Sequence, residues 1–325
     1  MFDISLVRYL PKNTNVPFIK VRLVAMVLSL LAIIASIFLF TTKNLNYGLD
    51  FKGGTVWEFH LTESPTDGDL TAIRALGPKL GLGELAIQTI GQSDKDKVQA
   101  IRLSVSKQAA LEGDENDDQA QQVALKSIQV AVVEMYPEVA NTENTLSVQV
   151  LGTKVSGELK KKGAMAVILA LMMVLLYIWF RFEWQFGLGA VVALAHDVIL
   201  TIGVFSFTAL EFNLSIVAAI LTIVGYSLND TVIVYDRIRE NLRKYKKKPL
   251  ADVLNLSIND TLSRTIMTSV TTMLALVALY VWGGPGLHGF AFAMIWGVFV
   301  GTYSSIFVAS PILLLLGVNR TGPQK

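Results

Sequence analysis

Residues Gly225–Asn241 read GYSLNDTVIVYDRIREN, a stretch that starts inside an apolar run and ends in charged residues. The apolar run begins near Leu214 and continues to Asp236, which is about the length of a helix that crosses a bilayer. Asp230 lies about six residues before the charged end, or about 9 Å inside the run at about 1.5 Å per residue. A carboxylate at this depth costs on the order of 2.5–3.5 kcal/mol on insertion scales. The stretch therefore predicts a membrane helix with a functional or partnered acid.

The composition of the 325-residue chain is typical of a polytopic membrane protein. Hydrophobic residues make up 52% and charged residues 17%, and the mean hydropathy is +0.50. The net charge of +2 and the lack of a basic stripe with interleaved aromatics give no indication of nucleic-acid binding. The chain has no cysteine, its three histidines lack ligand spacing, and it has no GxxxxGK[ST] loop. We therefore expect no enzymatic activity, catalytic residue, metal or cofactor.

Apolar runs predict six membrane-spanning helices. The first, residues 23–41, follows a basic segment, residues 1–22. Its apolar run is longer than the core of a cleaved signal peptide and ends in large residues, so we expect an uncleaved span. The other five fall in one block, residues 163–317, with a basic loop at residues 237–263 and a short tail at residues 318–325. The expected bounds of these five spans are 164–180, 186–210, 214–236, 266–282 and 288–316.

Residues 42–162, between the first and second spans, are polar, acidic in places and interrupted by turn residues. The elements expected there alternate as strand, helix, strand, strand, helix and strand, which is typical of a ferredoxin-like fold. Their expected bounds are 56–61, 69–80 after an aspartate cap, 85–90, 98–105, 119–135 and 145–151. Acidic residues at 112–118 are interpreted as a solvated connection. The predicted fold is a six-helix membrane protein with a ferredoxin-like α+β periplasmic domain between helices 1 and 2.

Basic residues predict the orientation of the helices. The turns at residues 211–213 and 283–287 contain no Lys or Arg, whereas residues 237–248 contain seven. By the positive-inside rule, this basic loop and both termini lie in the cytoplasm, and the inserted domain lies in the periplasm. Lys160, Lys161 and Lys162 fall on the outer side, but they belong to a long translocated domain, for which the rule is weak.

Asp230 is the first candidate for a functional residue. Helical spacing places the hydroxyls of Tyr226 and Ser227 on its face, one turn away, and Asn229 adjoins it in the sequence. One interpretation is a structural carboxylate that a neighbouring helix satisfies. The other is a proton carrier, because a carboxylic acid in low dielectric can exchange a proton near neutral pH.

Arg264, at the start of the fifth span, is the expected partner of Asp230. The two residues lie at comparable depth if the fourth and fifth helices are antiparallel. An arginine does not release its proton, so it would tune Asp230 while the carboxylate exchanges protons. The alternative is an interfacial anchor whose side chain reaches the lipid headgroups.

A second acid, Asp197, lies near the middle of the third span, deeper than Asp230 and next to His196. Adjacent residues of a helix point about 100° apart, so both side chains can face protein only in a crowded bundle. A proton relay and a polar contact that holds helices together are equally consistent with this pattern.

Three motifs resemble the SecF family, the smaller membrane subunit of the accessory complex of bacterial Sec protein export. They are YGLDFKGG at residues 47–54, the stretch around Asp230, and LSRT at residues 262–265, in the order of that family. The resemblance implies that Asp230 and Arg264 serve proton-driven work. It also implies that Gly53 and Gly54 join the first span to the periplasmic domain, where glycine relaxes the backbone.

Three functions are open at this point. The resemblance implies an accessory subunit of protein export in the bacterial inner membrane that uses the proton-motive force. Its implied partners are SecD, the SecYEG channel, YajC, an unfolded preprotein in transit and protons. A proton-coupled exporter half of the RND type shares the plan of six spans and an outer domain, but such exporters have larger outer domains. A passive scaffold would have little reason to keep Asp230.

Overall fold

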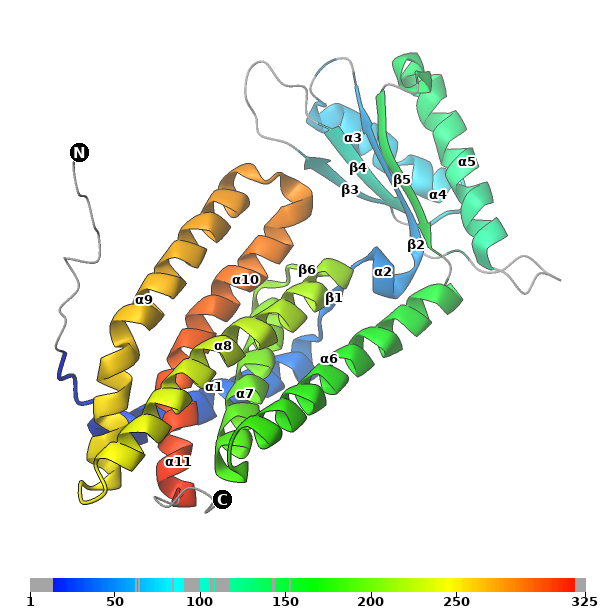
Figure 1. Ribbon diagram of the computed structural model, residues 1–325. Coiled ribbons are helices and arrows are strands. Elements are labelled where there is room, and N and C mark those ends of the chain that lie inside the picture. Colours follow the sequence, from blue (N-terminus) through cyan, green and yellow to red (C-terminus); the bar gives the residue numbers. More distant parts are fainter. Residues whose placement is uncertain are drawn as a thin grey trace, which may run out of the picture. The chain divides into compact units, whose positions relative to one another are not determined.

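The computed structural model describes residues 14–61, 63, 65–83, 85–90, 100–105, 108, 117–141, 144–151 and 153–318. The chain divides into two compact units, Tyr47–Ala164 and the helical segments that precede and follow it in the sequence (Figure 1). Several expectations lie outside the described residues: the basic residues before residue 14, the strand start at 98–99, the acidic connection at 112–116, and the tail from residue 319.

The α+β unit has the predicted alternation of strands and helices. Its described part contains a four-stranded antiparallel sheet in the order β3-β4-β2-β5. This order confirms the ferredoxin-like fold, and strands β3 and β5 have the predicted bounds. The elements, with β1 and α2 before them, are β1 Asn46–Tyr47, α2 Leu49–Lys52, β2 Gly54–His60, α3 Asp67–Arg74, α4 Leu76–Lys79, β3 Leu85–Ile90, β4 Ala100–Val105, α5 Asp117–Met135, the 3-10 turn Pro137–Ala140 and β5 Thr145–Leu151.

Alternating side chains build the core of this unit. Trp57 and Phe59 on β2 point to one face of the sheet, where they pack with Ile101 on β4 and Ile128 on α5. The aromatic rings of Trp57 and Phe59 lie 4.3 Å apart between centroids. The sequence pattern of the strands therefore determines which face the helices cover.

The first of the two helices predicted for this unit begins earlier than expected. We expected one helix over 69–80 after an aspartate cap, but Thr66 is the N-cap and Asp69 is the third helical residue, and the two form a capping box. The helix also divides at Ala75 into α3 and α4. The correction has a physical reason: the Thr66 hydroxyl accepts from the Asp69 amide at 3.3 Å, while Asp69 Oδ2 accepts from the Thr66 amide at 2.8 Å.

Tyr136 also donates a hydrogen bond to Asp69 Oδ1 at 2.7 Å. The bonds from Thr66 and then from Tyr136 hold the pKa of Asp69 below its ordinary value of 3.8. Burial, followed by the bond to Asp69, raises the pKa of Tyr136 to about 12, so this hydroxyl stays protonated and donates.

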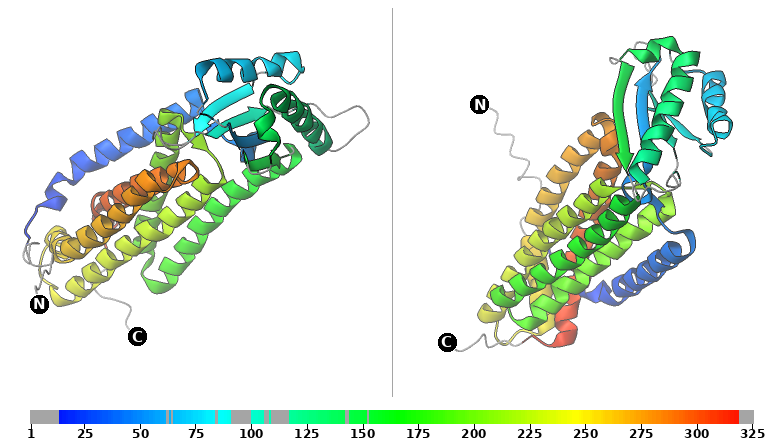
Figure 2. Two further views of the ribbon diagram at one scale, coloured as in Figure 1. Left: turned by 90° about the horizontal axis from the view of Figure 1, so that it is seen from above. Right: turned by 90° about the vertical axis from the view of Figure 1, so that its right-hand side faces the viewer.

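The helical unit confirms the six predicted spans. Six of its described helices are long and apolar enough to cross a membrane. The spans formed by α7, by α8 and by Gly286–Leu316 are the most buried. Helices α1, α6 and α9 lie on the outside of the bundle (Figure 2). The elements are α1 Arg22–Lys43, α6 Thr153–Arg181, α7 Trp184–Thr208, β6 Glu211–Phe212, α8 Leu214–Lys244, α9 Leu250–Trp282, α10 Pro285–Ser304, the π-helical turn Ser305–Ala309 and α11 Ser310–Leu316.

The basic loop expected at residues 237–263 is mostly helical. Helix α8 continues to Lys244 and α9 starts at Leu250, so only residues 245–249 connect them. An apolar stripe on the end of α8, which includes Ile238 and Leu242, packs in the same cluster as Val253 on α9. Charged residues on the outer faces concealed this pairing in the sequence.

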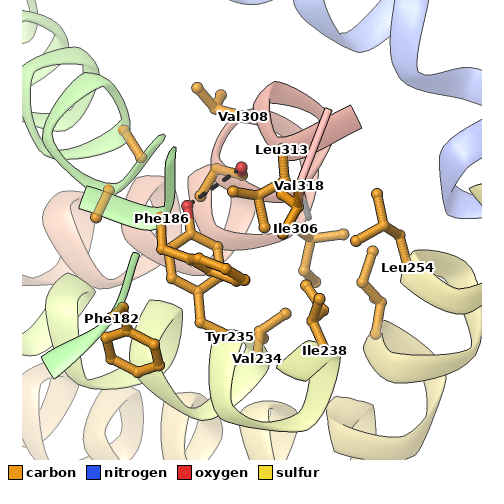
Figure 3. Packing of buried hydrophobic residues seen from close by; sticks show 14 of the residues in the cluster. Phe182, Phe186, Val234, Tyr235, Ile238, Leu254, Ile306, Val308, Leu313 and Val318 are labelled. Atoms are coloured by element: carbon orange, nitrogen blue, oxygen red, sulfur yellow. Dashed lines mark hydrogen bonds between the residues drawn. The ribbon is translucent and has the colours of Figure 1, made fainter. Parts of the chain in front are cut away.

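Tyr235 lies at the centre of the packed end of the bundle (Figure 3). Its ring meets those of Phe186 and Phe182 edge-on, with centroids 5.1 and 6.3 Å away, and its hydroxyl donates to the Ala309 carbonyl at 3.2 Å. A Cβ at Gly189 would come within 2.5 Å of that hydroxyl oxygen, so glycine is required there. This core fixes α7, α8 and the π-helical turn against one another.

Candidate functional site

Asp230 is buried in the bundle, with 4% of its surface exposed. Its Oδ1 accepts a hydrogen bond from the Thr265 hydroxyl of α9 at 2.8 Å. Its Oδ2 is also buried, and no described residue donates to it. A buried carboxyl oxygen without a donor is costly when ionised, and it has room for a proton. The geometry therefore leaves Oδ2 of Asp230 able to take up a proton.

Ser227 does not serve Asp230, although the two residues share a helical face. Its hydroxyl donates instead to Asp197 Oδ2 on α7 at 2.7 Å. The Tyr226 hydroxyl is buried and has no hydrogen-bond partner among the described residues, and Asn229 is exposed. The Ser227 hydroxyl thus lies one turn from Asp230 along α8, as helical spacing predicts, but it bonds to the other acid. Helical spacing gives neighbours within one helix, whereas the packing of α7 decides where this hydroxyl points.

Asp197 is 1% exposed and has hydrogen-bond partners on both oxygens. Besides Ser227, the Ser304 hydroxyl at the end of α10 contacts Oδ2 at 2.8 Å, and His196 Nδ1 lies 2.9 Å from Oδ1. This acid therefore joins three helices. The His196 ring stacks on Tyr303 with centroids 6.2 Å apart, and its Nε2 has no partner in the described part of the chain.

A series of hydroxyl contacts links the surroundings of the two acids. Ser305 follows Ser304 directly and contacts the Thr231 hydroxyl, next to Asp230, at 2.8 Å. Ser304 and Ser305 lie where α10 passes into the π-helical turn, and such turns are frequent at functional sites. The same side of α10 is held close to α8 at Gly301, where a Cβ would approach the Ser227 Cβ to 3.0 Å.

Arg264 does not form the predicted ion pair with Asp230. It is exposed, and the part of the chain that the structure describes contains no ion pair involving it. Arg264 does lie at a depth along the bundle comparable to that of Asp230, because the next residue, Thr265, contacts Asp230. Adjacent helical residues point about 100° apart, so only one of the two can face α8.

Thr265, Ser304 and Ser305 were missed by sequence reasoning. Thr265 is part of the LSRT motif, and its position after Arg264 was the available signal. Two adjacent serines inside the last apolar run were a second signal, because buried hydroxyls in membrane helices need partners.

Gly53 and Gly54 have positive φ values of 72° and 129°. Residues other than glycine rarely adopt these conformations, so the backbone at the start of β2 requires glycine at both positions.

No group of three or more His, Asp or Glu side chains within the described ranges could hold a metal ion.

Comparisons with families of known proteins agree with these motifs. The family described as protein export membrane protein SecD/SecF, C-terminal, matches residues 131–319, and the SecD/SecF GG motif matches residues 38–61. The second match includes Gly53 and Gly54.

Solved structures with this architecture include SecDF of Thermus thermophilus, described as a translocon-associated membrane protein, with a TM-score of 0.77 and 31% identity. The match covers 96% of this chain but 39% of that one. SecDF in a super-membrane-facing form gives a TM-score of 0.62 at 33% identity, over 97% of this chain and 39% of the other.

Curated relatives match along nearly their whole length. The protein translocase subunit SecF of Rhodobacter capsulatus is 44% identical over 98% of this chain and 94% of its own length. SecF of Rickettsia rickettsii is 40% identical over 98% of this chain and 97% of its own. The chain therefore belongs to the SecF family of protein translocase subunits.

Proposed function

We propose that this chain is an accessory subunit of the Sec protein translocase that uses the proton-motive force, together with SecD, to promote preprotein translocation across the inner membrane. The SecF relatives and the SecDF structures support the subunit and the SecD partnership. The chain corresponds to 39% of the SecDF chains, so SecD would supply the remainder of such an assembly. The SecYEG channel and YajC are proposed as further partners from the family resemblance.

The outer helices have surfaces suited to lipid or to a membrane partner. In α1, α6 and α9, large apolar side chains such as Leu23, Met165 and Leu274 are more than 60% exposed. A face of this kind on a multi-pass protein is covered by acyl chains or by another membrane subunit. This supports the proposal that SecD packs against the bundle.

The proposed orientation has both termini in the cytoplasm and the α+β unit in the periplasm. The basic residues from Arg237 to Lys248 surround the short connection between α8 and α9, as the positive-inside rule expects of a cytoplasmic end. The turn between α7 and α8 and the turn before α10 lack basic residues and would face the periplasm.

Asp230 is the group that we propose to carry protons. The observation behind this proposal is its buried Oδ2, which lacks a donor among the described residues while Oδ1 is held by Thr265. One charge that crosses 100 mV supplies about 2.3 kcal/mol, so a few protons could drive a rearrangement of the outer domain. In this mechanism Arg264 would modulate Asp230 through space, and Gly53 and Gly54 would let the outer domain move.

Asp197 and His196 have a different proposed role. Because hydroxyls of α8 and α10 both donate to Asp197, the acid holds these helices in a fixed arrangement. Ser305 contacts Thr231 beside Asp230, and the adjacent Ser304 contacts Asp197, so this pair of serines would transmit a change at Asp230 to the arrangement. For Tyr226 and Asn229, a supporting role in proton exchange at Asp230 rests only on their position near it in α8.

The direct test uses inverted membrane vesicles in which a precursor is exported under a proton gradient. We expect Asp230→Asn to remove the proton-dependent part of export, because the amide fills the same space but cannot exchange a proton. Asp252→Asn is the matched control, since Asp252 is exposed in the first turn of α9. Normal proton-dependent export by Asp230→Asn would contradict the proposed role of this residue.

Co-purification in mild detergent tests the assignment as a translocase subunit separately. We expect a SecD-like protein and the export channel to accompany the chain, in the wild type and in Asp230→Asn alike. Recovery with a second exporter half, and without the channel, would favour an RND-type exporter instead.

A further inference from the structure

An open hollow of about 580 Å³ lies at the end of the bundle where basic residues gather. It is formed by the last residue of α6 and by the final turns of α8. Four of its side chains are basic and two are acidic. The lining residues are Arg181, Asp236, Arg239, Glu240, Arg243 and Lys244.

Both acidic residues of this hollow are already engaged. The Asp236 carboxylate accepts from Arg181 at 3.1 and 3.3 Å, and Glu240 accepts from Arg237, which is not one of the lining residues, at 2.7 Å. Arg239, Arg243 and Lys244 form no ion pair with any carboxylate in the described part of the chain. The hollow therefore presents cations without enough anions to neutralise them.

Phe182 orients two of the guanidinium groups. Its ring lies 4.8 Å from Arg181 Cζ and 6.0 Å from Arg239 Cζ, and the phenylalanine itself is buried. Stacking on an aromatic ring leaves the edge of a guanidinium free to form two hydrogen bonds with a phosphate. The cluster is thus built into the junction of α6 and α8 rather than spread over a solvated surface.

Exposed aromatic side chains mark the depth of the hollow. Trp179 and Phe180 on α6 and Trp184 at the start of α7 are 62%, 91% and 56% exposed. Large aromatic residues at the ends of membrane helices lie at the level of the lipid headgroups. The apolar surface of α6, with Met172 and Met173 more than half exposed, begins next to the hollow and offers a path for acyl chains.

We propose that this hollow binds the phosphate of an anionic phospholipid headgroup. Arg239 and Arg243 would contact the phosphate, while Arg181, held by Asp236, would border the site. Basic pockets between membrane helices bind anionic headgroups in this way, and each cation near the headgroups adds to the attraction. This site goes beyond the proton-coupled function and does not depend on it.

The test measures lipid binding to the full-length chain, purified in detergent, by native mass spectrometry. Phosphatidylglycerol and phosphatidylcholine with identical acyl chains are the two probes. We expect the double variant Arg239→Gln, Arg243→Gln to weaken phosphatidylglycerol binding on the order of tenfold and to leave phosphatidylcholine unchanged. The matched control Lys247→Gln, Lys248→Gln removes the same charge outside the hollow and should have little effect.

Asp236→Asn gives a prediction of the opposite sign. It removes a negative charge and frees Arg181, so phosphatidylglycerol binding should strengthen, which an unfolded variant cannot mimic. Equal effects of the two double variants, or weaker binding by Asp236→Asn, would overturn the proposal. Displacement of phosphatidylglycerol by inorganic phosphate at equal concentration would overturn the assignment to a lipid.

Discussion

Asp197 and Asp230 are both buried acids in one helical bundle, yet their surroundings differ. Asp197 has hydrogen-bond partners on both oxygens, from α7, α8 and α10. Asp230 receives one donor, from α9, and its second oxygen has none among the described residues. An acid whose two oxygens both have hydrogen-bond partners stabilises the helices around it. An acid with one unpartnered buried oxygen is more stable once that oxygen takes up a proton. We propose that this contrast separates a structural role, for Asp197, from a functional one, for Asp230.

The largest effect on stability is expected from Asp197→Ala. It leaves two serine hydroxyls and one histidine ring without their buried acceptor, which should cost about 2–4 kcal/mol. Asp197→Asn keeps one acceptor oxygen and should cost about 1 kcal/mol. Asp230→Asn should cost less than about 1 kcal/mol, because the Thr265 hydroxyl keeps an acceptor. Reversible unfolding in mixed detergent micelles measures all three, and a reversed order would break the distinction between the two acids.

The close approach of α8 and α10 one turn before Ser227, the residue that bonds to Asp197, can be probed next. A Cβ at Gly297 would collide with the Ile223 side chain, so Gly297→Ala should lower the unfolding free energy by about 1–3 kcal/mol. The matched control is Gly225→Ala, because open space surrounds Gly225. Alanine favours a helix over glycine at both positions, so the control should be neutral or slightly stabilising. Equal effects at the two glycines would show that the two helices are not tightly packed there.

A smaller effect than that of Gly297→Ala is expected at Asp69, a carboxylate in the α+β unit whose two oxygens both accept hydrogen bonds. Hydrogen bonds from Thr66 and Tyr136 lower the pKa of Asp69, so its contribution to stability is present above 3.8 and is lost as the pH falls through the lowered pKa. Tyr136→Phe should therefore destabilise α3 by about 0.5–1.5 kcal/mol at neutral pH and by little in strong acid.

Amide hydrogen exchange of α3 in the full-length chain, at neutral and at acidic pH, measures this difference. Ser127→Ala is a suitable control, because among the described residues the Ser127 hydroxyl bonds only within its own helix, to the Val123 carbonyl. A destabilisation by Tyr136→Phe that persists unchanged in acid would contradict the role of its bond to Asp69.

The sequence was sufficient to predict the helices, the strands and the presence of two acids inside apolar spans. Apolar length predicts the spans, and alternation predicts strands such as β3 and β5, because both patterns are local. The contacts of the acids were not predictable to the same extent. The rotation of α9 decides that Thr265, and not Arg264, faces Asp230, and the packing of α7 decides that Ser227 contacts Asp197.

The helical hairpin after Asp236 illustrates a second limit. Its charged residues predicted a basic cytoplasmic connection, and the sequence did not show that the apolar residues between them pack against α9. The basic hollow arises from the same packing, because it requires Arg181 on α6 beside the end of α8. Features that depend on two distant segments were therefore found only in the structure.

Infrared difference spectroscopy of the reconstituted full-length chain, recorded at a series of pH values, tests the central claim most directly. We expect a carbonyl stretch of a protonated carboxyl group that changes with pH, disappears in Asp230→Asn and persists in Asp197→Asn. A pH-dependent band that persists in Asp230→Asn, or that is lost in Asp197→Asn instead, would contradict the assignment of the exchangeable proton to Asp230.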